Sequence, residues 1–206
     1  MSDTNSISES ELLLLSALAE MSIPLDCMFF KKSTFEREFR EKWHGLTLDG
    51  VLVAISNLVA SELVYLTKKE NTNKHLLETW NIIVNLTAKG GALWEERRRV
   101  RWEEYIGDGD DVDEPSDSGQ RIVFRSVVAA PLKQLAQMLE PHSSAFEVAP
   151  PGIASAGEWQ WSRWKRFDRS YAMTVRIRAG AETPHFSAMA TLFEIRDTVT
   201  QGFIDG

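Results

Sequence analysis

The chain has 206 residues, of which 43% are hydrophobic and 26% are charged, a composition typical of folded globular proteins. This length allows one large domain or two small ones with a substantial core. The formal net charge of -7 at pH 7 repels phosphate polyanions on average. The composition therefore argues against a disordered chain, and any nucleic-acid role needs a local basic patch.

The cysteine content and the first residues indicate a compartment. Cys27 is the only cysteine, so neither an intramolecular disulfide nor a cysteine-based metal cluster can form. The start MSDTNSISESE lacks the basic residues of a secretory signal, and the apolar run at 12–15 is far too short to span a bilayer. We expect a cytoplasmic protein that is neither exported nor inserted into a membrane.

The first half of the chain predicts three helices. Ser8 and Glu11 form a capping-box pattern ahead of apolar residues at helical spacing, which predicts a first helix over residues 9–21 that Pro24 closes. The same capping pattern begins a short second helix that ends near residue 45. Ser33 and Glu36 form the capping pair, and Phe35, Phe39 and Trp43 lie on one face of this helix. Thr47 is the expected N-cap of a third helix. The apolar stripe of that helix is Leu48, Val51, Leu52, Ile55, Leu58 and Val59.

A hairpin and a fourth helix are expected next. Residues 63–68 and 80–86 are rich in β-forming side chains and flank the polar turn ENTNK, which predicts two paired strands, or a wing. Thr87 can cap a helix running roughly over 88–105. The glycines at 90 and 91 weaken the first turn of that helix.

The second half begins with GDGDDVDEPSDSGQ at 107–120, where acidic and turn-forming residues leave almost nothing to bury. We interpret it as an exposed linker or loop. After it, we expect strands at 121–128, 159–167, 171–178 and 186–195, a helix at 131–140, and irregular chain at 146–157. The predicted fold class is α+β, with a domain at 1–106, an acidic linker at 107–120, and a small antiparallel-sheet domain with one helix at 121–206.

The order helix, helix, helix, hairpin, helix over residues 9–105 resembles a winged helix-turn-helix domain. The third helix and first wing strand of that family are similar to TLDGVLVAISNLVASELVYLT in this chain. The segment that commonly follows the wing is similar to VNLTAKGGALWE. The resemblance covers about half of the chain. It implies that the third helix enters the DNA major groove, where exposed polar and basic side chains read bases and phosphates.

The charge of the third helix argues against that role. Its expected exposed positions are Asp49, Ala54, Ser56, Asn57, Ala60, Ser61 and Glu62, with no lysine or arginine among them. Because phosphate contacts supply most non-specific affinity, a recognition helix with two acids and no base starts with an electrostatic penalty. Protein contact is therefore favoured over DNA contact for this helix.

Three basic groups are candidates for contact with nucleic acid or other anions. They are the wing lysines Lys68, Lys69 and Lys74, the run Arg97, Arg98, Arg99 and Arg101, and the group Arg163, Lys165 and Arg166. The favoured alternative for the arginine run is a solvated helix in which neighbouring glutamates pair with the arginines. The third group is interleaved with tryptophans that could stack bases. Strand alternation would instead turn Trp159 and Trp161 toward the core, which favours a core with a cationic rim.

The acidic segment is the candidate binding site for a basic protein. Its candidate partner-binding residues are Asp108, Asp110, Asp111, Asp113 and Glu114. A calcium loop beginning at Asp108 would place Asp113 where glycine is needed and Gly119 where the closing glutamate belongs, so a calcium site is not expected. The alternatives are a solvated linker and electrostatic capture of a basic partner.

These patterns favour a binding protein over an enzyme. The four histidines are scattered, and the chain has no nucleophile elbow, phosphate loop or dinucleotide fingerprint. We expect no cofactor and no metal. The first hypothesis is a non-enzymatic interaction or adaptor protein that binds a basic partner, for which an immunity protein or antitoxin is one concrete version. The second is a DNA-binding transcriptional regulator with a C-terminal sensing or dimerisation domain, and the third is an enzyme whose site is assembled from distant residues. Nothing in the sequence specifies an oligomeric state.

Overall fold

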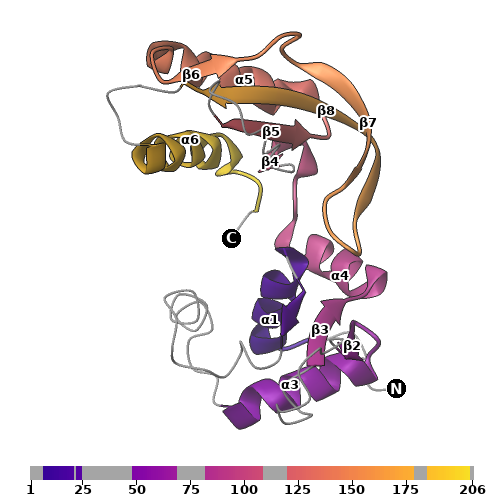
Figure 1. Ribbon diagram of the computed structural model, residues 1–206. Helices are drawn as coiled ribbons and strands as arrows, with labels where there is room; N and C mark the ends of the chain where they lie inside the picture. Colours follow the sequence, from indigo (N-terminus) through magenta and orange to yellow (C-terminus); the bar gives the residue numbers. More distant parts are fainter. Residues whose placement is uncertain are drawn as a thin grey trace. The chain divides into compact units, whose positions relative to one another are not determined.

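The computed structural model describes residues 7–20, 22–24, 48–68, 82–108, 120–178 and 185–204 (Figure 1). Contacts within the chain group it into two compact units, each of which takes up two stretches of sequence. Unit 1 comprises Met1–Arg97 and Ser162–Lys165, and unit 2 comprises Arg98–Trp161 and Arg166–Gly206. Helices and antiparallel sheets occur together, so the protein belongs to the mixed α+β class, as predicted. The division into domains at 1–106 and 121–206 with a linker at 107–120 stays a prediction.

Unit 1 opens with α1 (Glu9–Glu20), which begins where the capping box places it. The Ser8 backbone N–H donates to Glu11 Oε2 at 2.7 Å, and the Glu11 N–H donates to Ser8 Oγ at 3.2 Å. Each residue thus satisfies a backbone donor that the first turn leaves without a helical partner. The predicted start of this helix is confirmed. Its fully buried leucines are Leu14, Leu15 and Leu18.

Two further helices and a small sheet make up most of the rest of unit 1 that the structure describes. The elements are β1 (Ile23–Pro24), α3 (Leu48–Ala60), β2 (Val64–Lys68), β3 (Ile82–Leu86) and α4 (Ala88–Arg98). The three strands are antiparallel in the order β1-β3-β2, so the predicted pairing of the two β-rich runs is confirmed. The expected second helix at 33–45, its capping pair, Thr47 and the ENTNK turn lie outside the described residues.

Helix α4 begins as predicted but ends early. The Gly90 N–H donates to Thr87 Oγ1 at 2.9 Å, which is the expected N-cap bond. The helix ends at Arg98, because Arg99 adopts a left-handed conformation with φ 49°. A single 3₁₀ turn, η3 (Trp102–Glu104), follows in place of the helix expected to continue to residue 105.

Unit 2 is built on a five-stranded antiparallel sheet. Its strands are β4 (Gly107–Asp108), β5 (Arg121–Ser126), β6 (Phe146–Val148), β7 (Ala154–Gln160) and β8 (Arg166–Ile177). Their order is β4-β5-β8-β6, and β7 also pairs with β8. Helices α5 (Ala129–Leu139) and α6 (His185–Thr200) contribute to one hydrophobic core with the sheet, and η4 (Glu140–His142) follows α5. The fully buried residues at the centre of this core include Phe124, Leu132, Leu135, Met173, Val175 and Leu192.

Three expectations for this half are wrong. Residues 186–195 lie in helix α6 and not in a strand, because Ala188, Leu192 and Val199 recur at helical spacing and are the residues that reach the core. The second is the irregular chain expected at 146–157, which contains β6 and the start of β7. Gly157, with φ 69°, sits at a register shift in β7, and this bulge hides the alternation. The third is the strand expected at 159–167, which is interrupted at 161–165, where the chain turns from β7 into β8. The described part of unit 2 therefore has two α-helices and not one.

Candidate functional site

Helix α3 exposes large apolar side chains. Leu52, Val53 and Val59 are 41%, 59% and 38% exposed. Two expectations about this helix are wrong. The expected buried stripe includes Leu52 and Val59, but both are exposed. The expected exposed face includes Ala54, but this residue is buried. The buried stripe is centred on Val51, Ala54, Ile55 and Leu58, which shifts it by part of a turn from the predicted position.

The other exposed positions described in α3 and directly after it are polar except for one alanine, and one of them is acidic. They are Ser56, Asn57, Ala60 and, just after the helix, Ser61 and Glu62. We call Leu52, Val53, Ser56, Val59 and Ala60 the α3 face. The helix contains no lysine or arginine, so this face has no side chain that could pair with a phosphate.

A half-open groove of about 800 Å³ lies along one side of the α3 face. Its walls come from the residues before and within α1, from the last turn of α3, and from α4. The lining residues are Ile7, Glu11, Asn57, Leu58, Ala60, Ser61, Leu63, Lys89, Ala92, Leu93 and Glu96. The groove thus continues the α3 face from Ala60 toward α1 and α4.

Glu11 is the buried charge of this groove. Glu11 is only 8% exposed. Burial raises the pKa of Glu11, but hydrogen bonds from the Ser8 backbone, the Ser8 hydroxyl and the Asn57 amide outweigh burial and leave the pKa below its ordinary value. The carboxylate is therefore ionised at neutral pH. The sequence identified Glu11 as a cap but gave no sign that it would line a groove.

The tip between β7 and β8 belongs to unit 1 and carries two of the predicted anion-binding residues. Trp164 donates its indole N–H to the Ala19 carbonyl at 3.0 Å and meets Trp94 edge to face at 6.0 Å between ring centroids. Lys165 forms an ion pair with Glu95 at 2.6 Å, and Arg163 donates to Asn85 Oδ1 at 3.2 Å. These cations therefore have protein partners within unit 1.

The other predicted basic residues within the described ranges are divided between the two units. Arg101 pairs with Glu104 at 2.7 Å and also donates to the Gly202 carbonyl, whereas Arg166 pairs with Glu158. Arg97 is the last residue of the first stretch of unit 1, and Arg98, Arg99 and Arg101 belong to unit 2. Lys68 is exposed at the end of β2. Lys69 and Lys74 lie outside the described residues.

The tryptophans expected in a core lie in an aromatic cluster within unit 2. Trp159 is 6% exposed and stacks with Tyr105 at 6.4 Å between ring centroids. Trp161 meets Trp102 at 4.7 Å, and Trp102 also meets Phe203 at 5.1 Å. The sequence could not reveal this cluster, because these members come from three separate stretches of the chain.

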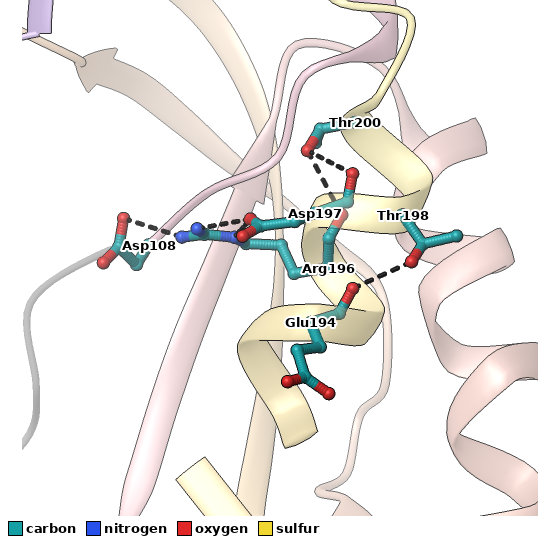
Figure 2. A network of polar contacts seen from close by, with 6 residues as sticks. All are labelled: Asp108, Glu194, Arg196, Asp197, Thr198 and Thr200. Carbon is teal, nitrogen blue, oxygen red and sulfur yellow. Dashed lines mark hydrogen bonds and ion pairs between the residues drawn. The ribbon is translucent and has the colours of Figure 1, made fainter. Parts of the chain in front are cut away.

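Asp108 is the one predicted partner-binding acid within the described residues, and it has a partner in its own chain. Its carboxylate lies 3.4 Å from the Arg196 guanidinium, which also pairs with Asp197 at 2.6 Å (Figure 2). Arg196 lies over the Phe193 ring at 4.8 Å, so its position on α6 is fixed from two sides. The other predicted acids are outside the described part of the chain: Asp110, Asp111, Asp113 and Glu114.

No protein-family model, curated protein or solved structure matches this chain. Within the described ranges, no three His, Cys, Asp or Glu side chains are grouped so that they could hold a metal ion. The described helices also include none that is long and apolar enough to cross a membrane. The α3 face and the groove beside it are the candidate site considered below.

Proposed function

We propose that this chain is a non-enzymatic protein-interaction protein whose α3 face contacts a basic partner protein. The observation that carries the proposal is the exposure of Leu52, Val53 and Val59 on a helix without a basic residue. Covering apolar side chains with a protein surface lowers the free energy of the complex. Contact with a charged phosphate backbone does not stabilise them in this way.

A winged-helix-like scaffold in unit 1 is part of the proposal. Its support is the order of the described elements, with α1 and α3 followed by the β2–β3 pair and then by α4, together with the sequence resemblance over 9–105. In this scaffold the third helix is the usual contact element, and here its surface chemistry suits a protein.

The basic character of the partner follows from charge. The chain has a net charge of -7, and acidic side chains border the α3 face at Glu62 and, across the groove, at Glu96. Charge complementarity would speed the encounter with a basic protein and would select against acidic ones.

Site-specific photo-crosslinking tests the contact. A photoreactive amino acid replaces Val53 on the α3 face or, as a matched control, the exposed Lys133 on α5 of unit 2. We expect the Val53 position to crosslink one basic protein in cells, and to crosslink it again when both proteins are purified. The control position should not crosslink that protein.

Titration against random duplex DNA separates this proposal from the alternative of a transcriptional regulator. The proposal predicts no binding at either low or moderate salt. Salt-sensitive binding that Val53→Asp weakens would overturn it, and so would the absence of any reproducible crosslink from Val53.

A further inference from the structure

The groove beside the α3 face carries acidic groups that its own cation does not balance. Glu11 Oε2 accepts both the backbone N–H and the hydroxyl of Ser8, whereas Glu11 Oε1 accepts only the Asn57 amide, at 3.1 Å. A carboxylate oxygen can accept two hydrogen bonds, so Oε1 retains capacity for one more donor. The ionised carboxylate therefore has room for a further hydrogen bond at the groove wall.

Lys89 is the cation of the groove, and it is directed to the end of α3. Its ammonium group donates to the Ser61 carbonyl at 2.9 Å and lies 3.5 Å from the carboxylate of Glu62. Glu96, on α4, is exposed and makes no ion pair within the described ranges. The groove thus has one cation that is already paired and two carboxylates, Glu11 and Glu96, that are not.

The remaining walls suit an aliphatic chain. Ala60 and Ala92 are exposed to the groove and Leu93 is half-buried, whereas Leu58 and Leu63 lie beneath them and are only 1% and 4% exposed. A long side chain with a methylene stem and a charged end can bury the stem against such residues and keep its charge at a polar rim.

We infer that this groove receives an arginine side chain of the partner protein, with the stem along Ala60, Ala92 and Leu93 and the guanidinium between Glu96 and Glu11. This inference rests on the proposed function, because it names the partner residue that the site would recognise. Arginine fits better than lysine, since its planar guanidinium offers several donors at once and can reach two carboxylates. The volume of about 800 Å³ also leaves space for residues that flank the arginine.

Nuclear magnetic resonance titration of the full chain tests the inference. The probe is N-acetyl-arginine amide, and its matched control is the neutral isostere N-acetyl-citrulline amide. We expect saturable shifts at the amides of Ser61, Ala92 and Leu93 with the arginine probe and none with citrulline. Glu96→Gln should weaken the affinity about twofold to fivefold, as expected for an exposed ion pair, and Glu11→Gln should weaken it about tenfold.

Glu103→Gln, at an exposed position of η3 outside the groove, should leave the titration unchanged. Because Glu96 is exposed, its substitution leaves the fold intact and keeps the test informative even if Glu11→Gln unfolds unit 1. Shifts with both probes, shifts with neither, or an affinity that Glu96→Gln does not alter would overturn the inference. Its failure is distinguishable from failure of the proposed function, because the Val53 crosslink does not depend on the groove, and arginine binding does not require a contact at Val53.

Discussion

Individual side chains of unit 1 do two things at once, and Glu11 is the clearest case. It caps α1 through Ser8 and bonds Asn57 of α3, so it joins the two helices, and it also faces the groove. Its pKa is lowered because hydrogen bonds to the charged form outweigh the cost of burial. The charge is therefore stabilised by folding, and this link between ionisation and stability can be measured.

We expect the free energy of unfolding to fall in acid in a way that depends on Glu11. The pKa of this carboxyl is lower in the folded chain than in the unfolded chain, so its contribution is present above the ordinary value of 4.5 and is lost as the pH falls through the folded pKa. Glu11→Gln should remove that part of the pH dependence and cost about 1 kcal/mol at neutral pH. Urea unfolding at several pH values measures both effects. If the free energy of unfolding of Glu11→Gln falls in acid as much as that of the wild-type chain, the assignment of this pH dependence to Glu11 is contradicted.

Two adjacent glycines in α4 show how close approach fixes residue identity. A Cβ at Gly91 would lie 1.9 Å from Trp164 Cε3, and a Cβ at Gly90 would lie 2.0 Å from the Leu63 carbonyl oxygen. The sequence suggests only that two glycines weaken the helix. The structure shows that both are buried and that each leaves space for a neighbour.

Gly91→Ala should therefore destabilise the protein by about 1 to 3 kcal/mol, although alanine favours a helix by about 1 kcal/mol over glycine. In the Trp164→Ala background the clash is absent, so Gly91→Ala should become stabilising. Gly90→Ala is the matched control, because its clash is with backbone and should persist in both backgrounds. Denaturant unfolding of the wild-type chain, the three single variants and the two double variants gives the coupling. Equal effects of Gly91→Ala in the two backgrounds would show that Trp164 does not fill this space.

At the scale of elements, the tip Ser162–Lys165 is a component of unit 1 that lies far from the rest of it in sequence. Trp164 contacts α1 through Ala19 and α4 through Trp94 and Gly91. The sequence indicates an aromatic and basic segment here but places it on a strand of the sheet. Local patterns could not show its true contacts, because they depend on which surface the hairpin tip reaches in three dimensions.

Removing the indole should loosen unit 1 selectively. Trp164→Ala deletes a half-buried aromatic ring and should cost about 2 to 3 kcal/mol, whereas Trp164→Phe loses mainly one hydrogen bond and should cost about 1 kcal/mol. Hydrogen exchange should accelerate in α1 and α4 and remain unchanged in β5 and α5. Arg166→Ala, at the exposed start of β8, should alter neither unit. Unchanged protection of α4 in Trp164→Ala would contradict the role of the tip.

The pair between Asp108 and Arg196 is expected to matter little for stability. The Asp108 side chain is 56% exposed, and solvent screens such a pair. Asp108→Asn should change the free energy of unfolding by less than about 1 kcal/mol, and the change should shrink as salt is added. Phe124→Ala, at a fully buried core position, should cost about 3 to 5 kcal/mol in the same urea titration. A larger effect from Asp108→Asn than from Phe124→Ala would refute this ranking.

At the scale of the whole molecule, the parts of the fold that depend on local chemistry follow from the sequence. The caps at Ser8 and Thr87 and the alternation in β5 and β8 predict these elements correctly. The sequence favours a strand where helix α6 lies, because β-forming side chains obscure the helical spacing of its buried residues. That spacing becomes clear only from the residues that reach the core. The lack of basic residues on α3 could be read from the sequence. The outward direction of Leu52 and Val59 could not, because it depends on how the helix is rotated against its neighbours.

The most direct test of the proposed function is the affinity of the purified crosslinked partner for the wild-type chain, Val53→Asp and Lys133→Asp, measured by calorimetry. A negative charge at the exposed Val53 leaves the core of unit 1 intact but disrupts an apolar contact. We predict that Val53→Asp weakens binding about tenfold or more and that Lys133→Asp does not. Equal affinities for all three chains would contradict the assignment of α3 as the contact surface.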